Sequence, residues 1–107
     1  MTDYLQVTTV ADTRETAAKL AGTAVAAKLA ASAQVHGPVT SFFWHEGESG
    51  EGEEWQVTLK TTTERYPELE SLLRQEHTWD NPEISAVRMV NGSAEYFAWI
   101  DRTVAGD

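Results

Sequence analysis

The chain contains no cysteine among its 107 residues. Disulfides, thiolate zinc sites, iron–sulfur clusters and thiol nucleophiles are therefore excluded. The sequence also lacks a run of about 18 apolar residues, the length that a membrane-spanning helix requires. Residues 1–4 show neither the basic nor the apolar segment that begins a signal peptide. We therefore expect a protein without a membrane partner, located in the cytoplasm.

Positive charge is scarce as well. The chain has 8 Lys and Arg against 17 Asp and Glu, a formal net charge of -9. An acidic surface repels phosphate backbones, so nucleic acid is a poor partner. The same field attracts cations without selecting among them. The length predicts one small domain over residues 1–107.

Apolar periodicity predicts most of the secondary structure. Alternation typical of strands marks residues 4–10, 31–45, 55–61 and 83–90, with a bend at Gly37-Pro38 in the second of these. Helical spacing marks residues 13–29, a segment that ends at residues 76–77, and a short C-terminal segment that contains residues 96–100. The acidic, glycine-containing segment 46–54 is expected to be a solvated loop.

Capping residues predict where the helices begin. Asp12 precedes the first helix and Glu15 stands three positions later, as in a capping box. Thr62 or Thr63 is expected to cap the second helix, because threonine is a suitable N-cap residue. The proline in the first turn that follows is compatible with a helix start. Ser93 is expected to cap the C-terminal helix after an Asn-Gly turn.

The predicted order is β-α-β-β-α-β followed by a helix. This order is typical of an α+β, ferredoxin-like domain with a four-stranded antiparallel sheet, two helices on one face and a short C-terminal helix. The second face of the sheet and the strand edges then need partners. The ten aromatic residues are many for so short a chain. We expect a homo-oligomer in which four of them pack across the interface: Phe42, Phe43, Trp44 and Trp55.

Several short strings, in order and without gaps, resemble one family along nearly the whole chain. The strings are Lys-Leu-Ala-Ala (28–31), Gly-Pro-Val-Thr-Ser (37–41), Trp-His-Glu-Gly (44–47), Leu-Lys-Thr (59–61), His77, Pro-Glu-Ile (82–84) and Asn-Gly-Ser-Ala-Glu-Tyr-Phe-Ala-Trp-Ile (91–100). Together they resemble the CutA divalent-cation tolerance family. The resemblance implies a homotrimer whose long second and third strands pair between subunits. It also implies a role in tolerance of divalent metals such as copper, and no established catalysis.

Departures from the family at three places bear on metal binding. Ser32 stands where the family often has cysteine, and a hydroxyl is a poor ligand for soft copper. The family often has Trp at the position of His45, and a His-His-Pro-Tyr string where this chain has Glu-His-Thr-Trp at 76–79. No tightly bound cofactor is expected. A metal site would be built from imidazole and carboxylate, which shifts the preference toward zinc, nickel or Cu(II).

The predicted binding site is a shallow pocket between subunits near Lys60, His77, Glu83 and Tyr96. His77 is the candidate metal ligand, in a weak or assembly-dependent site. A His at a helix C-terminus can instead favour the dipole and bond to the last carbonyls. Lys60 lies in an apolar strand, so it is expected to pair with Glu83 or Glu54.

Two other functions stay open at this point. A trimeric signalling or scaffold protein could bind a small anionic metabolite or a partner protein at the same clefts. An acid–base site of Lys60, His77 and Glu83 is a third possibility. The chain shows no nucleophile elbow, phosphate loop or paired-His motif, so we expect no enzyme.

Overall fold

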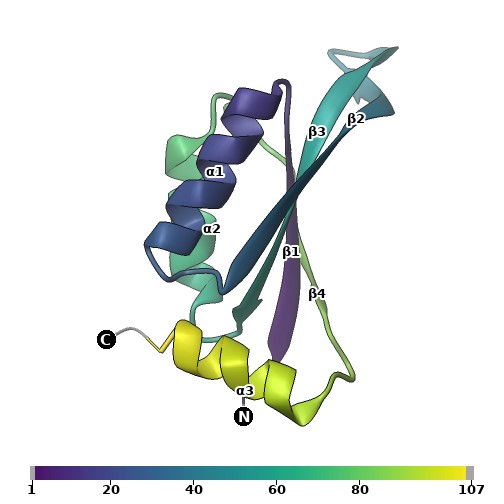
Figure 1. Cartoon of the computed structure of the whole chain (residues 1–107). Helices are drawn as coiled ribbons and strands as arrows, with labels where there is room; N and C mark the ends of the chain where they lie inside the picture. Colours follow the sequence, from purple (N-terminus) through teal and green to yellow (C-terminus); the bar gives the residue numbers. More distant parts are fainter. Residues whose placement is uncertain (1, 106–107) are drawn as a thin grey trace.

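The computed structural model describes residues 2–105. Its elements are β1 (Tyr4–Ala11), α1 (Arg14–Ala26), β2 (Ser32–His45), β3 (Glu48–Thr62), α2 (Tyr66–Glu76), β4 (Ile84–Arg88) and α3 (Ala94–Thr103). The sheet is antiparallel with the strand order β2-β3-β1-β4, and α1 and α2 cover one face of it (Figure 1). The predicted ferredoxin-like fold is thus confirmed. None of the helices in this part of the chain is long and apolar enough to cross a membrane.

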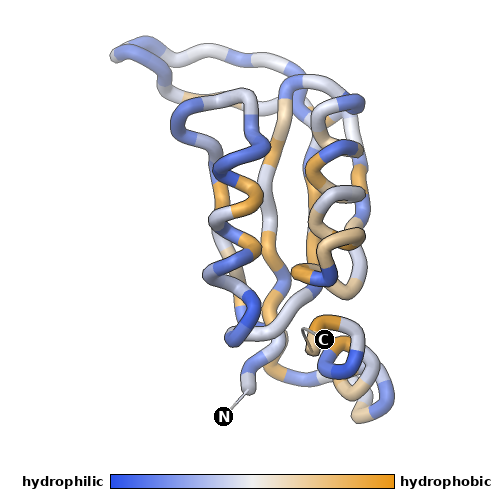
Figure 2. The backbone as a smooth tube through the Cα atoms, turned by 90° about the vertical axis from the view of Figure 1, so that its left-hand side faces the viewer, coloured by the Kyte–Doolittle hydropathy of each residue, from blue (hydrophilic) through white to orange (hydrophobic). Residues whose placement is uncertain are grey.

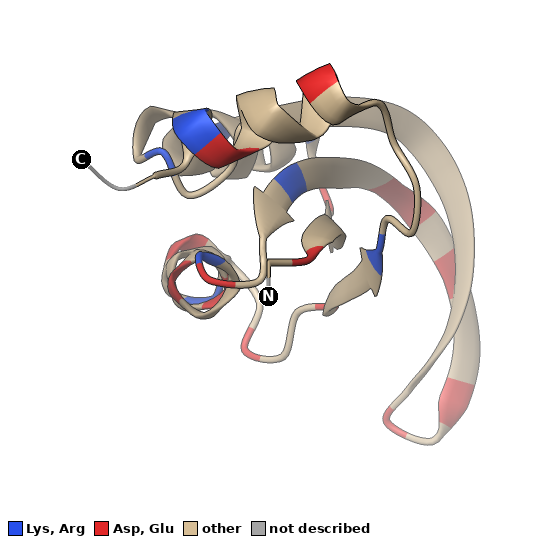
Figure 3. Cartoon of the chain, turned by 90° about the horizontal axis from the view of Figure 1, so that it is seen from below, with Lys and Arg blue, Asp and Glu red and all other residues tan. Residues whose placement is uncertain are grey.

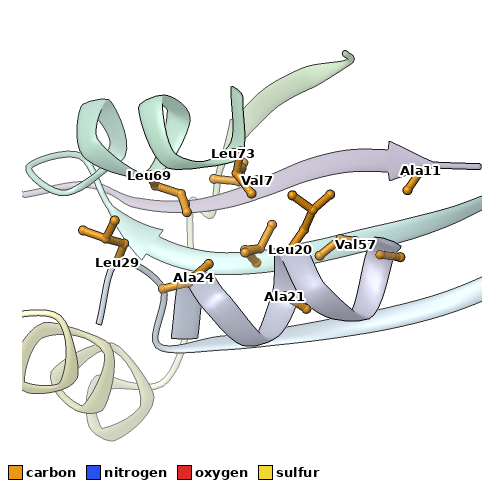
Figure 4. Close-up of a cluster of buried hydrophobic side chains, with 12 residues drawn as sticks. Val7, Ala11, Leu20, Ala21, Ala24, Leu29, Val57, Leu69 and Leu73 are labelled. Carbon is orange, nitrogen blue, oxygen red and sulfur yellow. The ribbon is translucent and has the colours of Figure 1, made fainter. Parts of the chain in front are cut away.

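The hydrophobic core lies between the sheet and the pair of helices. In Figure 2 the two helices lie side by side over the strands, and hydrophobic segments recur along both. Alternate residues of β3, namely Val57 and Leu59, are fully buried beneath the helices. Leu20 of α1 and Leu69 and Leu73 of α2 meet them from above, as Figure 4 shows for most of this cluster. The buried face of α1 is otherwise alanine, so this helix lies close to the strands.

Helix α1 differs from the prediction at both ends. Thr13, not Asp12, is the N-cap, and its side chain accepts a hydrogen bond from the Thr16 N–H. The helix ends at Ala26 because Lys28 adopts a left-handed conformation, with φ of 59°. The Leu29 N–H then donates back to the Ala24 carbonyl, as in a helix-terminating motif. The predicted extension to residue 29 was therefore wrong.

Helix α2 begins without a side-chain cap. Its N-cap is Arg65, which makes no capping hydrogen bond, and a proline occupies the first turn. The threonines expected to cap it have other roles. Thr62 is buried, and the Thr63 hydroxyl accepts from the Asp3 N–H and donates to the Asp3 carbonyl, both at 2.9 Å. Thr63 thus ties the end of β3 to the start of β1.

A two-stranded ribbon projects beyond the body of the domain. Strand β1 ends where Ala11 pairs with Trp55, so residues 39–54 of β2 and β3 pair only with each other (Figure 1). The expected loop at 46–54 was wrong: the turn contains only Glu46 and Gly47, with φ values of 52° and 82°, and β3 begins at Glu48. Positive φ at both central residues suits a two-residue hairpin turn, whose twist matches that of the strands. The acidic residues therefore lie along a strand, and Figure 3 shows them as red bands on it.

The base of the ribbon is marked by the predicted bend. The β2–β3 register breaks between His36 and Val39, which confirms an irregularity at Gly37-Pro38. A Cβ atom on Gly37 would lie 2.9 Å from the Trp55 ring, so only glycine fits there. Trp55 is half-buried against the core of its own chain rather than fully exposed for an interface.

The C-terminal helix covers the end of the sheet where β1 begins (Figure 1). Strand β4 is shorter than predicted, covering Ile84–Arg88 instead of 83–90. The Ser93 cap is confirmed, because its hydroxyl accepts from the Tyr96 N–H at 3.2 Å. Ile100 and Val104 are buried against the end of the sheet.

Two buried threonines provide a matched test of this core. The Thr61 hydroxyl donates to the Leu29 carbonyl at 2.7 Å, whereas the equally buried Thr9 hydroxyl has no partner among the described residues. We expect Thr9→Val to raise the free energy of unfolding by about 1 kcal/mol, because valine has nearly the same shape and no orphaned hydroxyl. Thr61→Val should lower it by about 1–3 kcal/mol, since it leaves a buried carbonyl unpaired. Urea unfolding at one protein concentration measures both, and equal effects of the two substitutions would contradict the hydrogen-bond assignment.

Candidate functional site

His77 is held in the fold through both nitrogens of its ring. It follows α2 directly, in an extended conformation with φ of -75° and ψ of 149°. Its Nε2 lies 2.7 Å from the Val10 carbonyl oxygen, and its Nδ1 accepts a hydrogen bond from the Trp79 N–H at 3.1 Å. These partners assign the neutral tautomer with the proton on Nε2. The imidazole does not bond to the last carbonyls of α2, as one reading of the sequence had it, but to a carbonyl of the sheet.

The Val10 carbonyl needs this donor because of where β4 begins. The Met89 N–H donates to the Tyr4 carbonyl, so the even-numbered residues of β1 direct their backbone groups toward β4. Strand β4 starts at Ile84, opposite Thr9, and does not reach Val10. His77 thus supplies the N–H donor that the residue before Ile84 would provide if β4 extended further. Val10 is buried, so an unpaired carbonyl there would be costly.

This arrangement restricts His77 as a metal ligand. A metal binds the lone pair of a neutral imidazole nitrogen. Here that lone pair, on Nδ1, is occupied by the Trp79 N–H. A cation could therefore bind His77 only if Trp79 and its neighbours moved away. The ring of Trp79 also packs against the imidazole, with 5.1 Å between centroids.

One chain does not bring the four predicted site residues together. His77 and the exposed Glu83 lie at the end of the sheet near Val10 and Thr9. Tyr96 lies on α3, at the opposite end, beyond Tyr4. Val10 and Tyr4 are six residue steps apart along the strand, which corresponds to about 20 Å. A site that contains all four residues would require more than one subunit.

Lys60 lies between these ends, opposite Gln6 of β1 and Ser32 of β2. In β3 the side chains buried beneath the helices belong to odd-numbered residues. Because side chains alternate between the two faces of a strand, Lys60 lies on the open face of the sheet. Within residues 2–105 Lys60 has no carboxylate within 4.0 Å, so the predicted ion pair with Glu83 or Glu54 does not form within one chain. The structure leaves Lys60 half-buried.

The other two histidines make polar contacts at the sheet surface. His36 Nε2 lies 3.1 Å from the side-chain oxygen of Gln56, on the open face. His45 lies exposed near the ribbon tip, 3.8 Å from a carboxylate oxygen of Glu46. In the part of the chain that the structure describes, no three His, Asp or Glu side chains are close enough to hold a metal ion together.

A cluster at the foot of the sheet was not foreseen from the sequence. The Tyr4 hydroxyl donates to the Asp101 carboxylate, and the Tyr4 ring stacks on Phe97 with 4.1 Å between centroids. The hydrogen bond to Asp101 raises the pKa of Tyr4, since it stabilises the protonated phenol. Arg88 pairs with Asp3 at 3.3 Å beside this cluster. A shallow hollow of about 280 Å³ opens there, and its lining residues are Thr2, Asp3, Tyr4, Arg88, Met89, Val90 and Phe97.

A second hollow lies between α2 and the segment that follows His77. It has a volume of about 200 Å³, and its lining residues are Glu70, Arg74, Asp80, Asn81, Pro82 and Ile84. Burial raises the pKa of Tyr66, and the nearby Glu70 carboxylate acts in the same direction. Charges of both signs line this hollow, and His77 is not part of it. It therefore adds no ligand to the imidazole.

Comparison with known proteins gives one consistent result. The model of the family described as CutA1 divalent ion tolerance protein matches residues 5–103. A divalent-cation tolerance protein CutA from Archaeoglobus fulgidus is 32% identical over 104 residues, covering 97% of this chain and 99% of the relative. Its solved structure, titled periplasmic divalent cation tolerance protein CutA, superposes with a TM-score of 0.87 over the same shares of the two chains. The divalent cation tolerance protein from Thermus thermophilus gives a TM-score of 0.88 at 30% identity, covering 91% of this chain and 94% of its own.

The bond between His77 and Val10 can be tested by substitution. We expect His77→Phe to lower the free energy of unfolding by about 1–3 kcal/mol, because it leaves the Val10 carbonyl and the Trp79 N–H without partners. The Trp79 amide should then exchange with deuterium faster than in the unmodified protein. His45→Phe is the matched control, since its ring is exposed, and it should change neither quantity. Equal stability of the two variants would show that the imidazole does not hold this segment.

Proposed function

This chain belongs to the CutA1 divalent ion tolerance family, and on that premise we propose that it is a non-enzymatic homotrimer that binds divalent metal ions and contributes to metal tolerance. The observation that carries the proposal is the family match over residues 5–103, together with relatives at 30% identity or more along nearly the whole chain. The general role in divalent cation tolerance is a property of the family. The trimer, the metal site and the preference among metals are the proposed parts.

The ribbon of residues 39–54 supports an oligomer. A lone two-stranded ribbon is marginally stable in water, and its outer edges carry unpaired backbone groups. It exposes Phe42 and Trp44, whose residues are 75% and 77% accessible in the single chain. Aromatic side chains this exposed on neighbouring positions are typical of a protein–protein interface. Pairing between the ribbons of neighbouring subunits would cover both the edges and the rings.

The metal site is proposed to lie between subunits, with His77 as one ligand. Carboxylates from a neighbouring chain would complete it, since the described residues of one chain include no three suitable groups close together. With no thiolate available, imidazole and carboxylate ligands suit zinc, nickel or Cu(II) better than Cu(I). Binding would be weak, because the cation must displace the Trp79 N–H from Nδ1.

A second candidate function is favoured by Lys60. This ammonium lies on the open face of the sheet without a carboxylate within 4.0 Å among the described residues. A trimeric signalling or scaffold protein could bind a small anionic metabolite there. A melting-temperature rise with added anionic metabolites, lost in Lys60→Met, would favour this function over metal binding.

The cytoplasmic location stays a prediction, and the relative from Archaeoglobus fulgidus is titled periplasmic.

The trimer is tested by native mass spectrometry. We expect a mass of about three times the 11.8 kDa of one chain. The double substitution Phe42→Ser and Trp44→Ser should shift the population toward single chains, because it removes the exposed rings of the ribbon. Val25→Ser on α1, a residue 38% accessible, is the matched control and should leave the trimer intact. A single-chain mass for the unmodified protein would overturn the proposal.

Metal binding is tested by isothermal titration with Cu(II), Zn(II) and Ni(II). We expect binding to at least one of these, with loss of the heat signal in His77→Ala and its retention in His45→Ala. Because the cation competes with the Trp79 N–H, the bound state should also show faster amide exchange at Trp79. If no metal binds with a dissociation constant below about 100 μM, the metal part of the proposal fails.

A further inference from the structure

The segment that joins β4 to α3 contains an exposed Asn-Gly pair. Asn91 and Gly92 are both exposed and lie outside any helix or strand. The backbone hydrogen bonds of this segment run from Met89 to Tyr4 on one side and from Phe97 to Ser93 on the other. None of the described hydrogen bonds involves the Asn91 side chain or the Gly92 N–H. The side-chain amide of Asn91 and the following backbone nitrogen are therefore both free to react.

Gly92 is required at its position by packing. A Cβ atom there would lie 2.6 Å from the ring of Phe97, far inside normal contact. The ring of Phe97 is itself stacked on Tyr4, so it cannot easily move away. The residue after Asn91 therefore has no side chain to shield its nitrogen. The contact that excludes larger residues also leaves this peptide bond chemically exposed.

We propose that Asn91 is a site of spontaneous modification, in which its side-chain amide is converted to aspartate and isoaspartate. The Gly92 nitrogen, after losing its proton to hydroxide, attacks Cγ of Asn91 and forms a new N–Cγ bond. The bond from Cγ to Nδ2 breaks, and Nδ2 takes a proton from water and leaves as ammonia, which regenerates hydroxide and gives a five-membered cyclic imide. Water then opens the ring at either carbonyl. One opening restores the normal backbone as aspartate, and the other leaves the main chain running through the side chain as isoaspartate.

The two products should act differently on α3. Isoaspartate lengthens the main chain by one carbon between two fixed points, the Met89–Tyr4 backbone bond and the Ser93 cap. That extra length displaces Gly92 from its close contact with Phe97. Aspartate keeps the chain length and adds a negative charge just before the N-terminus of α3, where the helix dipole favours it. Isoaspartate is therefore the product that loosens α3 from the foot of the sheet.

The chain contains its own control. Its only other asparagine, Asn81, is followed by Pro82, whose nitrogen carries no hydrogen and cannot form the imide. Asn81 is also exposed, so exposure alone does not distinguish the two positions. A difference between them would arise from the residue that follows.

The test uses the full chain, incubated at neutral and at mildly alkaline pH in ¹⁸O-labelled water and analysed by peptide mass spectrometry. We expect loss of the Asn91 amide with uptake of ¹⁸O, faster at the higher pH, with isoaspartate among the products and Asn81 unchanged. The isoaspartate fraction should show faster amide exchange along α3, whereas Asn91→Asp should exchange like the unmodified protein. An unchanged Asn91 in the folded chain, under conditions that convert a peptide of residues 88–95, would overturn the site. Equal exchange of α3 in the isoaspartate fraction and in Asn91→Asp would overturn its effect on the helix.

Discussion

The unequal lengths of β1 and β3 determine how the rest of the chain is arranged. Strand β3 runs over 15 residues, whereas β1 has 8 and ends opposite Trp55. Below that point β3 has a strand on each side and two helices above it, and this part contains the core. Beyond it β3 has only β2 as a neighbour, and the chain continues as a ribbon with exposed rings and carboxylates. The same polypeptide thus combines a domain with its own core and an extension that would be only marginally stable as an isolated ribbon.

The end of β1 is also where His77 lies. Because β4 stops short of Val10, an imidazole from the end of α2 completes the hydrogen bonding of the central strand. His77 therefore has a structural role in the fold that does not depend on any bound ligand. A metal ion at His77 would compete with the Trp79 N–H for Nδ1, so under the proposed function binding would require movement of the segment that carries Trp79 and leads to Glu83. The distance of Tyr96 from this end adds a second requirement, because only another subunit could bring such a residue close.

The errors of prediction have separate physical causes. The acidic segment 48–54 has the composition of a loop, but a strand is held by backbone hydrogen bonds to its partner, which do not depend on side-chain type once a tight turn sets the register. Asp12 and Thr63 are both suitable caps by residue type. The end of the preceding strand decides which backbone groups lie near each of these side chains. Thr13 therefore caps α1 in place of Asp12, and Thr63 bonds to Asp3 instead of capping α2. Lys60 was expected to need a carboxylate because its strand is apolar, but alternation places it on the open face.

The sequence by itself determined the order of strands and helices, the fold class, the bend at Gly37-Pro38 and the family, since apolar periodicity and local strings are properties of neighbours along the chain. The ribbon, the bond of His77 to Val10, the separation of His77 from Tyr96 and the Tyr4–Asp101 cluster were decided only by the tertiary structure. Each of these joins or separates residues far apart in the sequence. Strand register and strand length set such distances, and one residue's difference in either changes which groups meet.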